Sequence, residues 1–263
     1  MEPHGFVSMT TGPTAGPTPA LAPCAEDHSP PLPPSGILHL WHYQWGPDTD
    51  EADIRAHYAL LNSGERRRTD RFKVEHARIA ATLSSGILRR RIGSYLDRPP
   101  TVLSFRTGPH GKPYLAGEDQ AVPLMFNISH SGPHILMAFT SGEEIGVDVE
   151  IVRDRKFLQQ IADRHYHENE LTDIRRKPAA EQEAEFYRYW TMKEAWIKAL
   201  GVGLRYPIQS LDFSRQMMGA GETYFEAEDR SWWCSKLDGA ENARAAVVVE
   251  RRAAPPRDAE GGS

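Results

Sequence analysis

The segment Trp190–Gly203 (WTMKEAWIKALGVG) constrains the fold of this chain more than any other part of it. Its apolar residues recur at helical spacing and would bury one broad side of a helix. Gly201 and Gly203 then give the backbone the freedom to leave that helix. Because residues i and i+4 share a helix face, Glu194 and Lys198 lie on one stripe. An exposed ion pair of this kind is common and contributes only about 0.3–0.5 kcal/mol, so the rest of the chain must decide what the pair does.

Composition excludes several classes of protein. The chain has 263 residues, 40% hydrophobic residues and a formal net charge of −5, which disfavours general nucleic-acid binding. Its two cysteines, Cys24 and Cys234, indicate neither a disulfide framework nor a zinc site. The N-terminus lacks a secretory pattern, and no apolar run reaches the roughly 18 residues that cross a bilayer. We therefore expect a cytoplasmic protein that binds neither nucleic acid nor membranes.

Both ends of the chain are predicted to be disordered. Residues 1–35 are rich in Pro, Thr, Ala and Gly, and such a segment cannot bury enough apolar surface to order itself. Residues 252–263 have the composition of a second loose end.

Between these ends, apolar periodicity predicts helices alternating with strands. The expected helices are 52–61, 75–96, 157–174 and 181–200, and the expected strands are 36–45, 125–129, 135–140, 145–152, 224–227, 232–236 and 245–250. The strongest local prediction is a hairpin between residues 135–140 and 145–152 through Ser-Gly-Glu-Glu. Helices packed on mostly antiparallel strands make an α+β fold.

Two carboxylates lie on one face of a predicted strand in Gly146-Val147-Asp148-Val149-Glu150. Side chains alternate along a strand, so Asp148 and Glu150 point one way and the valines point the other. Like charges this close repel unless a cation neutralises them, and Mg²⁺ favours carboxylates together with waters and substrate phosphates. A solvated strand face beside arginines is the alternative.

Polar residues also occur just upstream, in Asn127-Ile128-Ser129-His130-Ser131. Neighbours in an extended chain point to opposite sides, so Ser129 and His130 cannot readily form a nucleophile–base pair. Hydroxyl, imidazole and loop amide groups are better suited to binding a phosphate. A turn capped by Asn and Ser is the structural alternative.

Basic residues offer further anion sites. Gly111-Lys112-Pro113, with Arg106 upstream, holds a lysine in a turn, and such a point charge suits a phosphate. Residues 66–68, three arginines near an expected turn between helices, and the basic run 175–177 are candidate surfaces for an acidic partner. No P-loop, Gly-x-Gly-x-x-Gly or HExxH motif is present, so an NTPase, a nicotinamide enzyme and a zinc protease are not supported.

In chain order the motifs are Gly-Lys-Pro, Phe-Asn-x-Ser-His-Ser, Gly-x-Asp-x-Glu and Trp-x-x-Lys-Glu-Ala-x-x-Lys. This series resembles the 4′-phosphopantetheinyl transferases of the surfactin-synthetase-activating (Sfp) type, over roughly residues 36–250. The resemblance implies an enzyme that moves the phosphopantetheine arm of coenzyme A to a serine of an acyl or peptidyl carrier protein and releases 3′,5′-ADP. It also implies a monomer built as a pseudo-dimer of two similar α+β halves, here residues 36–143 and 144–251, with coenzyme A in the cleft between them.

The resemblance further assigns roles to individual residues. Asp148, Glu150 and Glu194 would hold Mg²⁺ against the pyrophosphate, and Glu194 would act as the base for the carrier serine, directly or through a water. Lys198 would neutralise charge on the pyrophosphate. The residues expected to contact coenzyme A are His76, Arg106, Gly111, Lys112, Asn127, Ser129, His130, Asp148 and Lys198. The helix register leaves open whether His76 or Arg78 contacts the nucleotide.

Two other functions remain as alternatives. The first is a non-catalytic module of the same fold that binds coenzyme A or a nucleotide, and the intact Asp148, Glu150, Glu194 and Lys198 argue against it. The second is a hydrolase built on Ser129, which the absence of a Gly-x-Ser-x-Gly motif disfavours.

Overall fold

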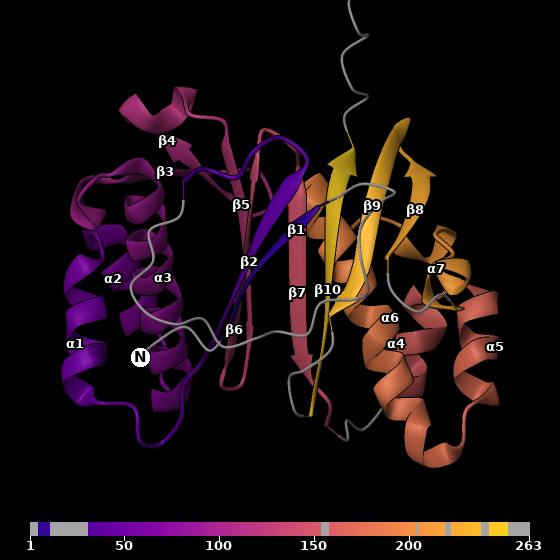
Figure 1. The fold of residues 1–263 in the computed structure, drawn as a ribbon. Coiled ribbons are helices and arrows are strands. Elements are labelled where there is room, and N and C mark those ends of the chain that lie inside the picture. The colour runs from indigo at the N-terminus through magenta and orange to yellow at the C-terminus, as the bar shows by residue number, and fades with distance from the viewer. Residues whose placement is uncertain are drawn as a thin grey trace, which may run out of the picture.

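The computed structural model describes residues 31–153, 158–203, 205–218, 222–237 and 242–251, and the backbone of residues 5–10. Within these ranges the strands form two four-stranded antiparallel sheets and one two-stranded hairpin. Helices lie on the outer side of each four-stranded sheet (Figure 1). The predicted α+β fold class is thus confirmed. No helix within the described ranges is long and apolar enough to cross a membrane.

The first sheet has the strand order β1-β2-β6-β5. Its strands are β1 (Gly5–Thr10), β2 (Ile37–Gln44), β5 (Leu124–Ser131) and β6 (His134–Ser141). Beside it lie α1 (Glu51–Leu60), α2 (Ser63–Asp70), α3 (Glu75–Leu96) and the hairpin of β3 (Ser104–Thr107) and β4 (Pro113–Ala116). Alternate residues such as Trp41 and Met137 pack with Leu83 of α3, so the sheet and the helix share one core.

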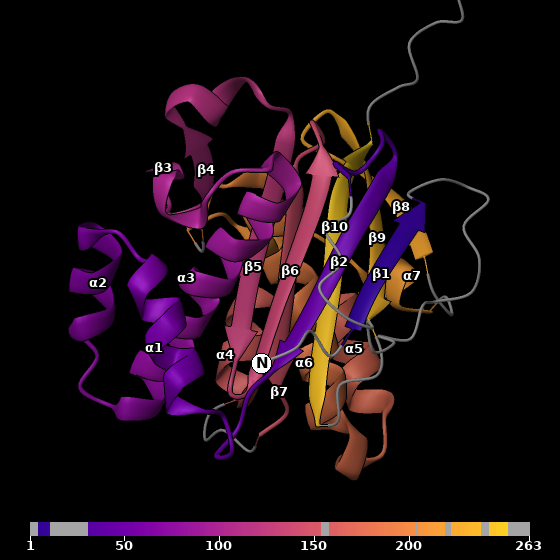
Figure 2. The same ribbon diagram turned by 60° about the vertical axis from the view of Figure 1, so that its left-hand side comes forward.

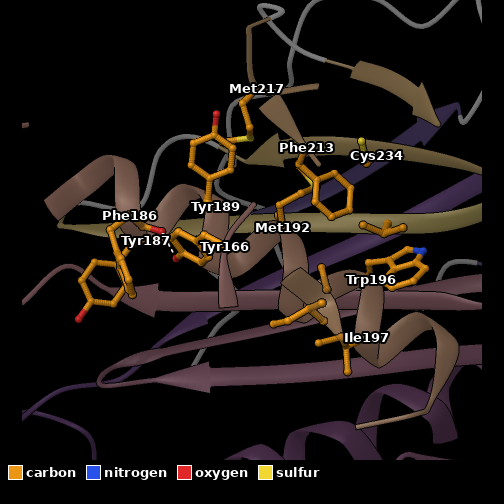
Figure 3. Close-up of a cluster of buried hydrophobic side chains, with 14 of the residues drawn as sticks. Tyr166, Phe186, Tyr187, Tyr189, Met192, Trp196, Ile197, Phe213, Met217 and Cys234 are labelled. Carbon is orange, nitrogen blue, oxygen red and sulfur yellow. Dashed lines mark hydrogen bonds between the residues drawn. The ribbon is translucent and has the colours of Figure 1, made fainter. Parts of the chain in front are cut away.

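The second sheet has the strand order β7-β10-β9-β8. Its strands are β7 (Ile145–Ile151), β8 (Glu222–Ala227), β9 (Arg230–Leu237) and β10 (Ala243–Arg251). Its outer helices are α4 (Leu158–His165), α5 (Glu168–Arg176), α6 (Ala179–Leu200) and α7 (Ser214–Met218). An aromatic core that includes Tyr166, Phe186 and Trp196 holds α6 on this sheet (Figure 3).

A third core joins the two sheets. Leu38 and Leu136 of the first sheet pack with Val147, Val247 and Trp233 of the second. The chain is therefore layered as helices, sheet, sheet and helices (Figures 1 and 2). Because alternate residues of β7 point into this core, the carboxylates between them must face the other way, toward α6.

The predicted hairpin between residues 135–140 and 145–152 is wrong. β6 pairs with β5, whereas β7 pairs with β10. Gly132 closes the β5–β6 turn with a φ of 54°, a left-handed conformation that glycine adopts without strain. The valines of β7 complete the core between the sheets, which places β7 in the second sheet.

Two helical predictions also need correction. Residues 66–68 lie within α2 and not near a turn, because Asn62 starts this helix with a capping box: Asn62 Oδ1 accepts from Glu65 N–H at 2.9 Å, and Glu65 Oε2 accepts from Asn62 N–H at 2.8 Å. The single helix expected over 157–174 is two helices. A second capping box, made by His167 and Glu170, starts α5.

The predicted disorder at residues 1–35 does not hold for β1, which pairs with β2 along its whole length. This stretch contains no proline, so each of its amides can donate to a neighbouring strand. Residues 1–4 and 11–30, and the C-terminal tail from 252 to 263, lie outside the described residues. The boundary between the halves at 143 and 144 stays a prediction.

Candidate active site

The two sheets meet along β5 and β7, and the predicted carboxylates lie at this junction. β7 is an edge strand, and side chains of β5 satisfy two of its amides. Val147 N–H donates to Asn127 Oδ1 at 3.0 Å, and Ile151 N–H donates to Ser131 Oγ at 3.2 Å. Buried backbone groups need such partners. The side-chain oxygen of Asn127 therefore holds the two halves together, which argues against its predicted contact with coenzyme A.

Helix α6 lies unusually close to β7. A Cβ at Gly146 would lie 1.9 Å from the carbonyl oxygen of Ala195, so only glycine permits this approach. Gly146, Asp148 and Glu150 share one face of the strand. The close approach therefore brings the helix residues Glu194 and Lys198 next to the carboxylates.

Lys198, Asp148 and Ser129 form one connected set. Lys198 Nζ lies 2.6 Å from Asp148 Oδ1 and 2.9 Å from Ser129 Oγ. Ser129 Oγ donates to the same oxygen of Asp148 at 2.7 Å. Asp148 is 4% exposed, so this ion pair is shielded from water far more than a surface pair. The ammonium of Lys198 thus pairs with the strand carboxylate, and the i+4 stripe on α6 is part of a site built by three elements.

Glu194 has the environment of a proton acceptor. Its Oε1 atom is buried and has no hydrogen-bond partner among the described residues. Burial raises the pKa of Glu194 to about 7; the Asp148 carboxylate also raises it, while the Lys198 ammonium lowers it. A carboxylate whose pKa lies near neutrality is well matched to general-base work.

The carboxylates fit a cation that takes part of its ligands from elsewhere. Asp148 Oδ2, like Glu194 Oε1, is buried without a hydrogen-bond partner in the described chain. Glu150 instead accepts from Ser131 Oγ at 2.7 Å. In the part of the chain that the structure describes, no three His, Cys, Asp or Glu side chains are close enough to hold a metal ion alone. Mg²⁺ commonly binds one or two carboxylates and completes its shell with waters and substrate phosphates, so two free carboxylate oxygens suit it.

A cavity of about 460 Å³ lies between α2, α3, the β3–β4 hairpin and β5. Its polar lining includes Asn62, Glu65, Arg68, Ser84, Ser85, Thr107 and His130. The carboxylate of Glu65 is paired with the buried Arg89 guanidinium at 2.8 Å, so its charge is already neutralised. Although the His130 side chain is exposed, partial desolvation lowers its pKa, and the Lys198 ammonium lowers it further. The imidazole is therefore neutral at pH 7. With one guanidinium and several hydroxyls, the cavity is suited to an anionic, polar ligand.

Lys112 does not face this cavity. Its side chain is 4% exposed, and Nζ contacts Glu144 Oε2 at 2.6 Å. The ammonium also donates to the carbonyls of Ile145 and Ala199, each at 3.0 Å. A lysine has three donors, so these contacts use all of them. This geometry opposes the predicted contact between Lys112 and a phosphate.

The other basic residues predicted to meet the nucleotide lie at the rim of the site or away from it. The Arg106 guanidinium lies over the Tyr114 ring, 4.5 Å from its centroid, at the exposed side of the hairpin. The His76 ring is 4.6 Å from the Trp45 ring. Arg78 pairs with Glu75 at 3.7 Å and lines a separate cavity next to α1. The structure therefore brings neither His76 nor Arg78 to the cavity that His130 lines.

Two features of the site were missed in the sequence. Of the three arginines at 66–68, only Arg68 lines the cavity, whereas Arg66 donates to the Ala59 carbonyl at 2.9 Å. The capping box at Asn62 was the signal that these arginines lie on a helix and point in different directions. Ser131 was the second omission. Ser129 and Ser131 alternate along β5 as Asp148 and Glu150 do along β7, so the hydroxyls and carboxylates meet in pairs.

Comparison with known proteins identifies the family. A family model described as the 4′-phosphopantetheinyl transferase superfamily matches residues 144–248. A second, described as 4′-phosphopantetheinyl transferase, N-terminal, matches residues 43–142. β5 lies within the N-terminal match and β7 begins the other, so the site lies at the contact between the two matched regions.

Individual relatives agree with the family models. The chain is 35% identical over 170 residues to the 4′-phosphopantetheinyl transferase HetI of Nostoc, which covers 65% of this chain and 71% of HetI. It is 30% identical over 171 residues to the 4′-phosphopantetheinyl transferase Sfp of Bacillus subtilis; the match covers 65% of this chain and 73% of Sfp. A phosphopantetheinyl transferase of Thraustochytrium is 26% identical over 221 residues; the match covers 78% of this chain and 75% of that protein. The chain belongs to the 4′-phosphopantetheinyl transferase superfamily and is a transferase of the type represented by Sfp.

Proposed function

We propose that this transferase moves the 4′-phosphopantetheine arm of coenzyme A to a serine of an acyl or peptidyl carrier protein and releases 3′,5′-ADP. The observation that carries the proposal is Glu194, a half-buried carboxylate whose pKa is raised to about 7 and which lies beside Asp148 and Lys198. In this reaction the serine oxygen bonds to the phosphorus that carries pantetheine, and the bond from that phosphorus to the ADP oxygen breaks.

The cavity next to His130 would hold the nucleotide end of coenzyme A. Arg68 would supply a positive charge, and Ser84, Ser85 and Thr107 would supply hydrogen bonds. Gly111 has a φ of 94°, and its missing side chain leaves open space at the turn between β3 and β4. The neutral His130 imidazole would donate one hydrogen bond to the phosphates.

Glu194 would take the proton of the carrier serine. A serine hydroxyl is a weak nucleophile at neutral pH and needs a base within hydrogen-bond reach. With Oε1 of Glu194 turned to the cation, the second oxygen of the same carboxylate would serve as that base, either directly or through one water. Lys198 would stabilise the charge that develops on the pyrophosphate oxygens. It would do so from its place next to Asp148 and Ser129.

The residues that would hold Mg²⁺ are Asp148 and Glu194, through their unpaired oxygens, with Glu150 as a third carboxylate. When bound there, Mg²⁺ supplies positive charge that the pyrophosphate needs during phosphoryl transfer. The protein contributes two buried carboxylate oxygens, Asp148 Oδ2 and Glu194 Oε1, that no hydrogen bond from the described residues occupies. A cytoplasmic location and a monomeric state remain predictions.

The test is direct transfer. Purified protein is incubated with coenzyme A, Mg²⁺ and purified apo carrier proteins of the acyl and peptidyl types, and carrier mass is followed by mass spectrometry. We expect at least one carrier to gain the mass of the phosphopantetheine arm, and 3′,5′-ADP to appear in equal amount. Binding of coenzyme A without a mass gain on any carrier would instead support the non-catalytic module.

Glu194→Gln tests the role of the base. Loss of a general base typically costs about 10²- to 10⁴-fold in rate. We expect a loss of this size in kcat, with coenzyme A binding retained in calorimetry. Near-normal turnover by the variant would exclude Glu194 as the base.

A further inference from the structure

The buried lysine in the Gly-Lys-Pro turn joins the two halves of the molecule. Lys112 lies between β3 and β4, beside the first sheet, and its three partners belong to the segment that follows that sheet. Glu144 directly precedes β7, Ile145 is its first residue, and Ala199 is the penultimate residue of α6. One ammonium therefore holds the beginning of the carboxylate strand and the end of the catalytic helix at the same point.

These partners are groups that need a cation. Ala199 O is among the last carbonyls of α6, which have no acceptor role within the helix, and a cation at a helix C-terminus is favourable. The carboxylate of Glu144 is 28% exposed, whereas the Lys112 side chain is 4% exposed. Burial lowers the pKa of Lys112, and Glu144 opposes that effect. The geometry is that of a satisfied internal ion pair, with no donor left for a ligand.

The backbone around Lys112 is shaped for this contact. Gly201, which ends α6 with a φ of 70°, lies where a Cβ would come within 3.3 Å of the Tyr114 hydroxyl and 3.7 Å of Lys112 Cδ. At Gly203 a Cβ would lie 3.1 Å from the His110 ring. Both glycines let the chain after α6 pack closely on the β3–β4 turn.

The contact acts on the active site through short, rigid connections. Ala199 directly follows Lys198 and is little more than one helical turn from Glu194. Ile145 is three residues before Asp148 on the same strand. Movement of α6 along β7 by even 1 Å would separate Lys198 from Asp148, and misplacements of that size can cost about 10²-fold in rate.

We propose that Lys112 is a positioning residue, which fixes α6 against β7 and so sets Glu194 and Lys198 opposite Asp148, and that it makes no contact with coenzyme A phosphates. The proposal rests on the transfer function given above. The Gly-Lys-Pro turn would therefore support catalysis by holding the catalytic side chains in place. Its loss would lower kcat and leave the affinity for coenzyme A unchanged.

The experiment compares Lys112→Met with the wild-type protein. Methionine keeps most of the side-chain length and removes the charge. We expect kcat to fall at least tenfold, while the Kd values for coenzyme A and for dephospho-coenzyme A, measured by calorimetry, each stay within about twofold. An unchanged kcat would overturn the proposal. A coenzyme A Kd raised tenfold with little change in the Kd for dephospho-coenzyme A would also overturn it, because this result is expected if Lys112 binds the 3′-phosphate that dephospho-coenzyme A lacks.

A second variant guards against simple misfolding. Glu144→Gln changes a partly exposed partner and leaves both carbonyl contacts of Lys112, so it should fold; thermal melting checks each variant. We expect a smaller fall in kcat with an unchanged coenzyme A Kd. The double variant should be no slower than Lys112→Met alone, because both changes remove one interaction. If the losses in kcat of the two single variants were fully additive in the double variant, Lys112 and Glu144 would not act through one interaction, which would contradict the proposal.

The same assay separates this inference from the proposed function. If the wild-type protein transfers nothing to any carrier, the proposed function fails. If the wild-type protein is active and Lys112→Met loses only coenzyme A affinity, the positioning role alone fails.

Discussion

Replacing Glu194 with glutamine should stabilise the metal-free protein at pH 8 far more than at pH 5, in addition to stopping transfer. The carboxyl of Glu194 titrates near its ordinary value of 4.5 in the unfolded chain, whereas burial and Asp148 raise its pKa to about 7 in the folded protein. Between these values the folded state binds more protons than the unfolded state. The free energy of unfolding therefore decreases as pH rises through this window.

The size of the effect follows from the two pKa values. Each pKa unit between the two states corresponds to about 1.36 kcal/mol. The folded protein therefore carries a cost of roughly 3 kcal/mol above pH 7, nearly all of which is absent below pH 4.5. Glutamine does not ionise and escapes this cost. The stability difference between the variant and the wild type should thus grow by about 2–3 kcal/mol from pH 5 to pH 8.

Urea unfolding at both pH values, with EDTA present, measures this difference. EDTA is required because a bound metal ion would favour the ionised carboxylate. Glu181→Gln, on the exposed first turn of the same helix, is the matched control. Its stability difference should change by less than about 0.5 kcal/mol between the two pH values. An equal effect of Glu194→Gln at pH 5 and pH 8 would refute the reasoning from burial.

Three further predictions concern other parts of the site. Lys198→Met removes the ammonium that pairs with Asp148, so we expect Mn²⁺, used as a probe for Mg²⁺, to bind the substrate-free protein more tightly in calorimetry; weaker binding would contradict this. Arg68→Ala should raise the KM for coenzyme A several-fold, while the exposed Arg67→Ala, which does not line the cavity, should leave KM unchanged; equal effects would show that the cavity is not the nucleotide site. Gly146→Ala should destabilise the protein by at least about 2 kcal/mol in urea unfolding, because its Cβ would collide with the backbone of α6; a smaller loss would mean that the helix can move away.

Local patterns in the sequence predicted much of the fold. Helix 75–96 begins and ends where its periodicity predicted, and the strands of both sheets other than β1 lie within a few residues of their predicted positions. The alternation of Val147, Asp148 and Val149 correctly placed the valines in a core and the carboxylate on the opposite face. These features depend on residues a few positions apart, whose relative directions the backbone geometry sets.

Such local patterns could not predict the order of strands in the sheets or the contacts between site residues far apart in the chain. The turn at residues 141–144 has the composition of a hairpin, yet β7 pairs with β10 because the core between the sheets needs its valines there. The capping box at Asn62 was visible in the sequence, and reading it would have given the start of α2. The break between α4 and α5 carries no such signal, because histidine is not among the residues that usually cap a helix.

The sequence by itself determined which chemical groups the protein has and on which face of each element they lie: carboxylates on one strand, Glu194 and Lys198 on one helix, and a lysine in a turn. Only the tertiary structure decided what they contact. In the folded protein Lys198 pairs with Asp148, one oxygen of Glu194 has no hydrogen-bond partner among the described residues, and Lys112 is buried between the halves. The physical reason is that hydrogen bonds and pKa values depend on distances of a few ångströms between elements far apart in the chain, and packing alone sets those distances.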